Sequence, residues 1–121
     1  MTSARAELGA RAERAVVAHL VAEGLEVLAT NVRVGRLEID VLARDGEVIA
    51  VIEVRTRGAG SWQRGLESID AGKRRRVREA GERLWRERFA KRADVERMRF
   101  DCASVTFDGG EARVEYVRAA F

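Results

Sequence analysis

Cysteine, histidine and proline are scarce or missing in this chain of 121 residues, which contains one cysteine, one histidine and no proline. The single cysteine, Cys102, cannot form an internal disulfide, so a reducing, cytoplasmic setting is expected. No uninterrupted apolar run approaches the roughly 20 residues that a membrane helix needs, so no membrane-spanning helix is expected. The opening residues, MTSARAELGARAE, contain no apolar segment typical of a signal peptide, and none is predicted.

The chain also lacks an internal repeat, a low-complexity tract and a large excess of charge of one sign. Its 23 basic and 20 acidic residues leave a formal net charge of +3, so the placement of the charges matters more than their sum. Apolar residues make up 46% and charged residues 36%, a balance that indicates a folded core under a highly charged surface. One domain spanning residues 1–121 is the expected organisation.

Hydrophobic periodicity predicts an α/β fold in which one mixed β-sheet is flanked by helices, in the order α-β-β-β-α-β-β. Helices are expected over residues 5–23 and 67–90, and strands over residues 25–29, 37–44, 47–55, 96–107 and 112–117. Residues 30–36 are expected to form a turn or irregular link, and residues 56–65 a glycine-rich loop. The expected inner faces are Glu13, Val16, Val17, Leu20 and Val21 in the first helix, and Ile69, Val77, Ala80, Leu84 and Phe89 in the second.

The stretch LEIDVLARDGEVIAVIEVRTR, residues 37–57, predicts a β-hairpin that carries acids inside apolar strands. A two-residue turn at Asp45-Gly46 would pair Arg44 with Glu47 and place Glu38 opposite Glu53. Side chains alternate along a strand. One face would therefore carry Glu38, Asp40, Glu53 and Arg55, and the other Leu37, Ile39, Val41, Ile52 and Val54.

Two glutamates opposite each other destabilise a hairpin unless a cation compensates, and two sources of positive charge are available. Arg36 and Arg55 would make a structural ion-pair network with the acids. Alternatively, Asp40 and Glu53 would hold Mg²⁺, since hard cations prefer carboxylate oxygens. Both interpretations are compatible with the pattern.

Two helix residues are expected to approach the same end of the sheet. Glu13 is an acid on the inner face of the first helix, and Gly9, one turn earlier, would allow close approach. Lys73 begins the inner face of the second helix, four residues before Val77. Several acids and a base around one end of a sheet are typical of metal-assisted phosphodiester cleavage.

Six stretches match one known family, in order, along nearly the whole chain: LGARAE, EGLEVLATNVR, LEIDVL, VIEVRTR, SIDAGKRRRV and RFDCASV. With them the chain resembles the bacterial YraN family, uncharacterised proteins with a three-layer, restriction-endonuclease-like fold of the PD-(D/E)xK superfamily, similar to archaeal Holliday-junction resolvases. The resemblance implies that Asp40 and Glu53 bind Mg²⁺ or Mn²⁺ and that Glu13 is a helix-borne catalytic acid. Arg55 stands where the superfamily has its catalytic lysine, two residues after the acid.

Some residues depart from the family pattern. Arg55 stays protonated, so it can stabilise charge but cannot act as a base. Ala12, Leu37 and Gln63 stand where the family commonly has glycine.

The densest basic run, KRRRVR, covers residues 73–78. One interpretation is a solvated helix face, because consecutive helical residues point in different directions. The other is a phosphate-binding groove lined by Arg57, Arg64, Lys73, Arg74 and others of the residues up to Arg78. Trp62, in the glycine-rich loop, would either stack on a base or pin the loop to the core.

Three functions remain open on these grounds. The first is a Mg²⁺-dependent endonuclease that acts on structured or branched DNA. The second is a non-catalytic nucleic-acid-binding module on the same scaffold, and the third a dimerising protein-interaction module. Nucleic acid, DNA in the first place, is the expected partner. A homodimer would suit a two-fold substrate. No membrane or small-molecule cofactor is expected. Asp101 is expected to have a structural role, such as a hydrogen bond to a loop.

Overall fold

The computed structural model describes residues 3–57 and 71–121, and within them the order α-β-β-β-α-β-β is confirmed. The elements are α1 (Ala4–Ala22), β1 (Glu26–Val34), β2 (Leu37–Asp45), β3 (Val48–Arg57), α2 (Ala71–Leu84), β4 (Arg97–Asp108) and β5 (Glu111–Val117). A short π-helical segment, η2 (Trp85–Phe89), continues α2. No helix in these ranges is long and apolar enough to cross a membrane.

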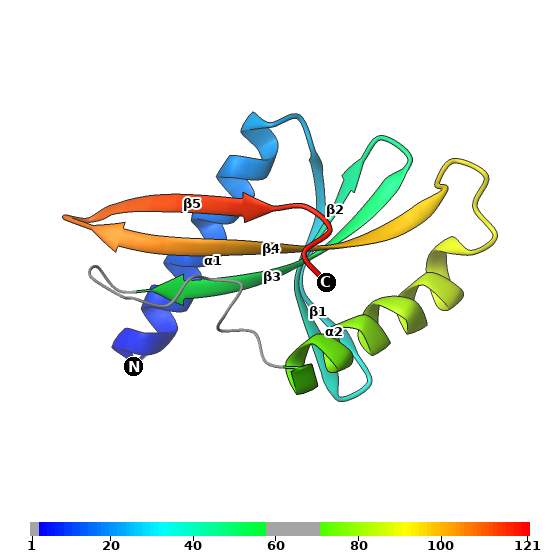
Figure 1. Ribbon diagram of the computed structural model, residues 1–121, viewed down its shortest axis with the longest axis horizontal. Coiled ribbons are helices and arrows are strands. Elements are labelled where there is room, and N and C mark those ends of the chain that lie inside the picture. The colour runs from blue at the N-terminus through cyan, green and yellow to red at the C-terminus, as the bar shows by residue number, and fades with distance from the viewer. Residues whose placement is uncertain (1–2, 58–70) are drawn as a thin grey trace.

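The strands of the described residues form one five-stranded sheet in the order β1-β2-β3-β4-β5. Strands β3 and β4 are parallel, and each other neighbouring pair is antiparallel. Helix α2 lies in the connection between the two parallel strands, as such a crossover requires. Helices α1 and α2 cover opposite faces of the sheet, so the expected mixed sheet between helices is confirmed (Figure 1).

Each helix packs on the sheet through its own apolar core. Helix α1 buries Ala12, Val16 and Leu20, a stripe at i, i+4 spacing, against one face. Val21, expected on that stripe, is instead 60% exposed, because the buried stripe is formed by residues 12, 16 and 20 and not by the positions that follow them. On the other face the core includes Val77, Ala80, Leu84 and Phe89, as expected. The remaining expected member, Ile69, lies outside the described residues.

Strand β1 is longer than predicted, because residues 30–34 continue it rather than form an irregular link. Val32 and Val34 are buried, and burial of these side chains favours pairing with β2 through Val34–Leu37. The misleading signal is Asn31, a turn-forming residue that adopts φ +51 inside the strand. The chain reverses only at Gly35-Arg36.

The β2–β3 hairpin turns one residue later than predicted. Asp45 pairs with Val48, so Gly46 and Glu47 are the central residues of the turn, and Gly46 has φ +63. Glycine is favoured at the first central position of such turns, because it adopts positive φ without strain. The whole register therefore moves by two residues, and the predicted pairing of Glu38 with Glu53 is wrong.

Strand β2 also breaks the predicted alternation of its side chains. Ile39 packs in the core on the α2 side, whereas Val41, two residues later, packs on the α1 side. Regular alternation would put both on one face, as the sequence predicted. The alternation breaks at Asp40. This residue lies opposite Asn31 of β1, between the pairs Thr30–Val41 and Val32–Ile39, and Asn31 has a positive φ of 51°. The side chains of β2 therefore change face at Asp40, opposite Asn31, and this change of face is called the β2 kink below.

Gly81 lets α2 lie close to β4. A Cβ atom at this position would come within 2.6 Å of Phe100 Cε1 and 3.1 Å of Met98 Sδ. We expect Gly81→Ala to lower the free energy of unfolding by about 1–2 kcal/mol, because overpacking outweighs the gain in helix propensity. Urea denaturation of the purified variant measures this change.

Gly9 in α1 is the matched control, because a Cβ atom there would meet nothing within 4 Å. The close approach expected at Gly9 is therefore absent. Gly9→Ala should raise the free energy of unfolding by roughly 0.5–1 kcal/mol. Stabilisation by both substitutions would contradict close packing at Gly81.

Candidate functional site

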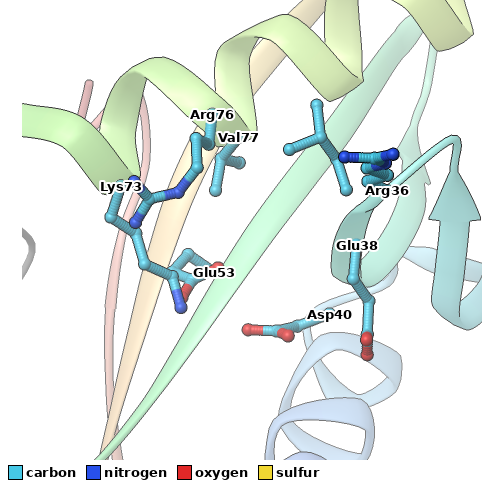
Figure 2. A pocket seen from close by; sticks show the side chains of 8 residues that line it. Arg36, Glu38, Asp40, Glu53, Lys73, Arg76 and Val77 are labelled. Atoms are coloured by element: carbon cyan, nitrogen blue, oxygen red, sulfur yellow. The ribbon is translucent and has the colours of Figure 1, made fainter.

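One cavity of about 290 Å³ gathers most of the charged residues singled out by the sequence. It is formed by the β1–β2 turn, β2, β3 and α2, as Figure 2 shows. Its lining residues are Arg36, Leu37, Glu38, Asp40, Glu53, Lys73, Arg76 and Val77. Three carboxylates thus share a small space with three basic side chains.

Asp40 and Glu53 lie at the point where the pairing of β2 and β3 ends. The last pair is Val41–Ile52, and Asp40 and Glu53 are the next residue on each strand. Asp40 Oδ2 accepts a hydrogen bond of 2.9 Å from the Val54 backbone N–H, which fixes its carboxylate against β3. In Figure 2 the Asp40 side chain extends toward Glu53. The shifted register therefore brings the two expected metal ligands closer than the predicted one would.

Glu53 is the most perturbed acid of this site. Its side chain is only 2% exposed, and Lys73 Nζ lies 2.8 Å from its Oε1. Burial is the main cause that raises the pKa of Glu53, to about 7, and the nearby Asp40 charge adds to it, while the Lys73 ammonium opposes both. A buried carboxylate beside another carboxylate needs a proton or a cation. Lys73 supplies such a cation from α2.

The donor set fits a hard divalent cation only in part. Among residues 3–57 and 71–121, no group of three or more His, Cys, Asp or Glu side chains is arranged to hold a metal ion. Two adjacent carboxylates nevertheless suit Mg²⁺, which keeps several waters and usually takes one or two carboxylates together with substrate phosphates. Asp40 and Glu53 are such a pair.

Glu13 lies on the opposite side of the β2 kink from Glu53. Its Oε1 accepts a 2.6 Å hydrogen bond from Asn31 Nδ2, and it lines a neighbouring cavity between α1 and β1. Burial raises the pKa of Glu13, and the negative charges of Asp40 and Glu38 add to the increase. Glu13 is thus electrostatically coupled to Asp40 without lining the cavity that contains Glu53.

The remaining expected site residues either do not line this cavity or lie outside the described residues. Arg55 follows Glu53 by two positions in β3 and pairs with Ser104 of β4, but it does not line the cavity. Arg74 is exposed in α2, and Arg57 ends β3. Arg64 and Trp62 lie outside the described residues, so their expected roles stay predictions.

Arg36 and Arg76 complete the basic side of the cavity. Arg76 belongs to the basic run from which a phosphate-binding groove was expected, whereas Arg36 was expected only to pair with the acids. A signal was available for Arg76, which follows Lys73 at i+3 and so shares its helix face. No comparable signal marks Arg36, because its position depends on how the β1–β2 hairpin folds against α2. Arg75, by contrast, does not line the cavity and belongs to the solvated part of the basic run.

Cys102 and Asp101 are buried in β4 and have structural environments. Cys102 pairs with Glu53, and burial raises the pKa of its thiol to about 11, so the thiol remains neutral. Asp101 is fully buried; its carboxylate accepts hydrogen bonds from Arg99, from the Tyr116 hydroxyl at 2.5 Å and from the Ala119 backbone N–H. These contacts agree with the structural role expected for Asp101.

Comparison with known proteins places these residues in a family. The model of uncharacterised protein family UPF0102 matches residues 12–105, more than half of the chain. The chain belongs to this family. UPF0102 is the YraN family, so the resemblance seen in the sequence is confirmed.

Several family members are similar along almost the entire chain. A UPF0102 protein of Sorangium cellulosum is 71% identical over 119 residues, which cover 98% of this chain and 83% of that protein. A UPF0102 protein of Alkalilimnicola ehrlichii is 43% identical over 116 residues, 95% of this chain and 86% of that protein. The family description names no activity, so membership by itself assigns none.

The raised pKa of Glu53 predicts a pH-dependent stability. Because the folded-state pKa of about 7 exceeds the ordinary 4.5, the folded protein binds this proton more tightly than the unfolded chain. Protonation of Glu53 therefore adds to the free energy of unfolding, fully below about pH 4.5, and this contribution is lost as the pH rises toward about 7. Glu53→Gln has no proton to lose at this position. In EDTA, the free energy of unfolding should therefore fall more for the parent than for the variant between pH 5 and 8.

Thermal unfolding across that pH range measures the difference. Glu38→Gln is the matched control, since it removes an exposed carboxylate from the same cavity. An equal change of the pH dependence by both substitutions would contradict a special environment of Glu53.

Proposed function

We propose that this protein is a metal-dependent endonuclease that hydrolyses phosphodiester bonds in structured or branched DNA. The observation that supports this most is the pair of adjacent carboxylates, Asp40 and buried Glu53, inside a cavity whose other wall is basic. Acidic side chains beside basic ones suit a polyanionic substrate that must be both bound and hydrolysed.

In the proposed site, Asp40 and Glu53 hold Mg²⁺ or Mn²⁺. A bound divalent cation neutralises phosphate charge and lowers the pKa of a coordinated water, which is the chemistry that hydrolysis requires. The Val54 N–H keeps the Asp40 carboxylate in position through its 2.9 Å hydrogen bond. Glu13, held by Asn31, lies beyond Asp40 and adds negative charge next to it.

The basic residues bind and orient the DNA backbone. Arg36 and Arg76 line the cavity from two different elements, so a phosphate between them would contact both walls. Arg55 remains protonated and contributes positive charge rather than proton abstraction. The preference for branched DNA rests on the resemblance to resolvase-like enzymes, for which a symmetric homodimer would suit a two-fold substrate.

Asp40→Asn tests the catalytic proposal. The purified parent should cleave a four-way junction or nicked duplex in the presence of Mg²⁺ or Mn²⁺, whereas Asp40→Asn should lose at least about 100-fold in rate, because one of two metal ligands is lost. Gel electrophoresis of end-labelled substrates, with and without EDTA, measures the cleavage. Cleavage by the variant at the parent rate would attribute the activity to a contaminant.

A second candidate function is a non-catalytic nucleic-acid-binding module on the same scaffold. Two observations favour it: arginine stands in the position of the superfamily's lysine, and the described residues contain no metal-binding group of three or more acidic, histidine or cysteine side chains. Tight, salt-dependent binding without turnover in Mg²⁺ or Mn²⁺ would support this function over the nuclease.

Both functions predict that the basic wall of the cavity binds nucleic acid. Arg36→Glu and Arg76→Glu should each weaken DNA binding and reduce the slope of log K against log salt by about 1, because each removes about one phosphate contact. Fluorescence anisotropy at several salt concentrations measures both quantities. Arg14→Glu, an exposed substitution on α1 across the sheet, is the control for net charge. An equal effect of Arg14→Glu would contradict binding at the cavity.

A further inference from the structure

Lys73 makes an ion pair that its expected role in phosphate binding does not explain. It is the third residue of α2, and its Nζ lies 2.8 Å from Glu53 Oε1. The two side chains differ sharply in environment, since Lys73 is 39% exposed and Glu53 is 2% exposed. The lysine thus reaches from the mouth of the cavity to its most buried acid.

Neutralisation of Glu53 explains why this contact forms. A carboxylate removed from water is strongly destabilised unless it is paired, and Asp40 adds a second negative charge beside it. In the described residues, Lys73 is the one basic side chain with an ion pair to Glu53. Lys73 therefore supplies part of the compensation that a bound cation would otherwise supply.

The same geometry sets up competition. A divalent cation held by Asp40 and Glu53 would stand next to the carboxylate oxygen that the ammonium already contacts. Two cations at such a distance repel each other, and this repulsion is weakly screened in a partly buried site. Metal binding at Glu53 and the ion pair with Lys73 thus oppose each other.

We propose that Lys73 is a displaceable counter-ion of the metal site: it neutralises Glu53 when no metal is bound, and moves to a substrate phosphate when metal and nucleic acid bind. This inference rests on the proposed metal-dependent function. A long, flexible, partly exposed lysine suits this exchange better than a planar arginine, which would grip the carboxylate with two hydrogen bonds. Arg36 and Arg76 line the same cavity, so a phosphate held there lies within the space into which Lys73 moves.

Mn²⁺ binding to the full chain without nucleic acid tests the inference. Isothermal titration calorimetry should show that Lys73→Met binds Mn²⁺ about tenfold more tightly than the parent, because the competing cation is gone. Arg76→Met is the matched control, since it removes a positive charge from the same cavity and helix but has no ion pair with Glu53 among the described contacts. It should tighten Mn²⁺ binding much less.

A second variant and a second readout separate this role from simple loss of folding. Lys73→Arg should weaken Mn²⁺ binding several-fold, because arginine holds Glu53 more firmly. In thermal unfolding, Lys73→Met should be less stable than the parent in EDTA and should gain more from Mn²⁺ than the parent does.

The outcomes distinguish the inference from the function on which it rests. Equal or weaker Mn²⁺ binding by Lys73→Met, or unchanged or tighter binding by Lys73→Arg, would overturn the role of Lys73 while leaving an Asp40-dependent metal site intact. If neither the parent nor Lys73→Met binds Mn²⁺, the metal site and the role of Lys73 are both overturned.

Discussion

The burial of Glu53 beside Asp40 is the constraint on which the rest of the site depends. A carboxylate that is 2% exposed needs a positive partner, and the fold provides Lys73 from α2 at 2.8 Å. That contact ties the first turn of the helix to the central strand β3 and defines one wall of the cavity. Folding thus places a cation of the helix over a buried acid of the sheet.

The β2 kink at Asp40, opposite Asn31, lets the Asp40 carboxylate influence acids on both faces of the sheet. Without it, β2 would keep regular alternation, and Asp40 would belong to one face of the sheet only. With it, the charge of Asp40 acts on both Glu53 and Glu13, which lie on different sides of the strand. Backbone irregularities of this kind recur next to functional sites, where they redirect a side chain.

The two buried acids of the sheet, Asp101 and Glu53, differ in how their negative charge is stabilised. Asp101 is surrounded by donors from Arg99, Tyr116 and Ala119, so its hydrogen-bonding capacity is used by the fold itself. Glu53 opens onto a cavity and has a flexible, partly exposed lysine as its ion-pair partner. The first arrangement locks the C-terminal segment to the sheet, whereas the second leaves a charge that ligands can contact.

Local patterns in the sequence determined the element order and the inner face of α2, because strand and helix periodicities are properties of neighbouring residues. They also determined that Asp40 and Glu53 lie at one end of a hairpin. The turn position was wrong by one residue, which moved the register of β2 and β3 by two residues and changed every predicted pair. The predicted faces held only in part, because Ile39 and Val41 lie on opposite faces of the sheet. The length of β1, the kink at Asp40 and the contact between Lys73 and Glu53 were decided only by tertiary structure. Each depends on how β1, β2 and α2 pack together, and residues 20 positions apart meet only when burial of the apolar core brings their elements into contact.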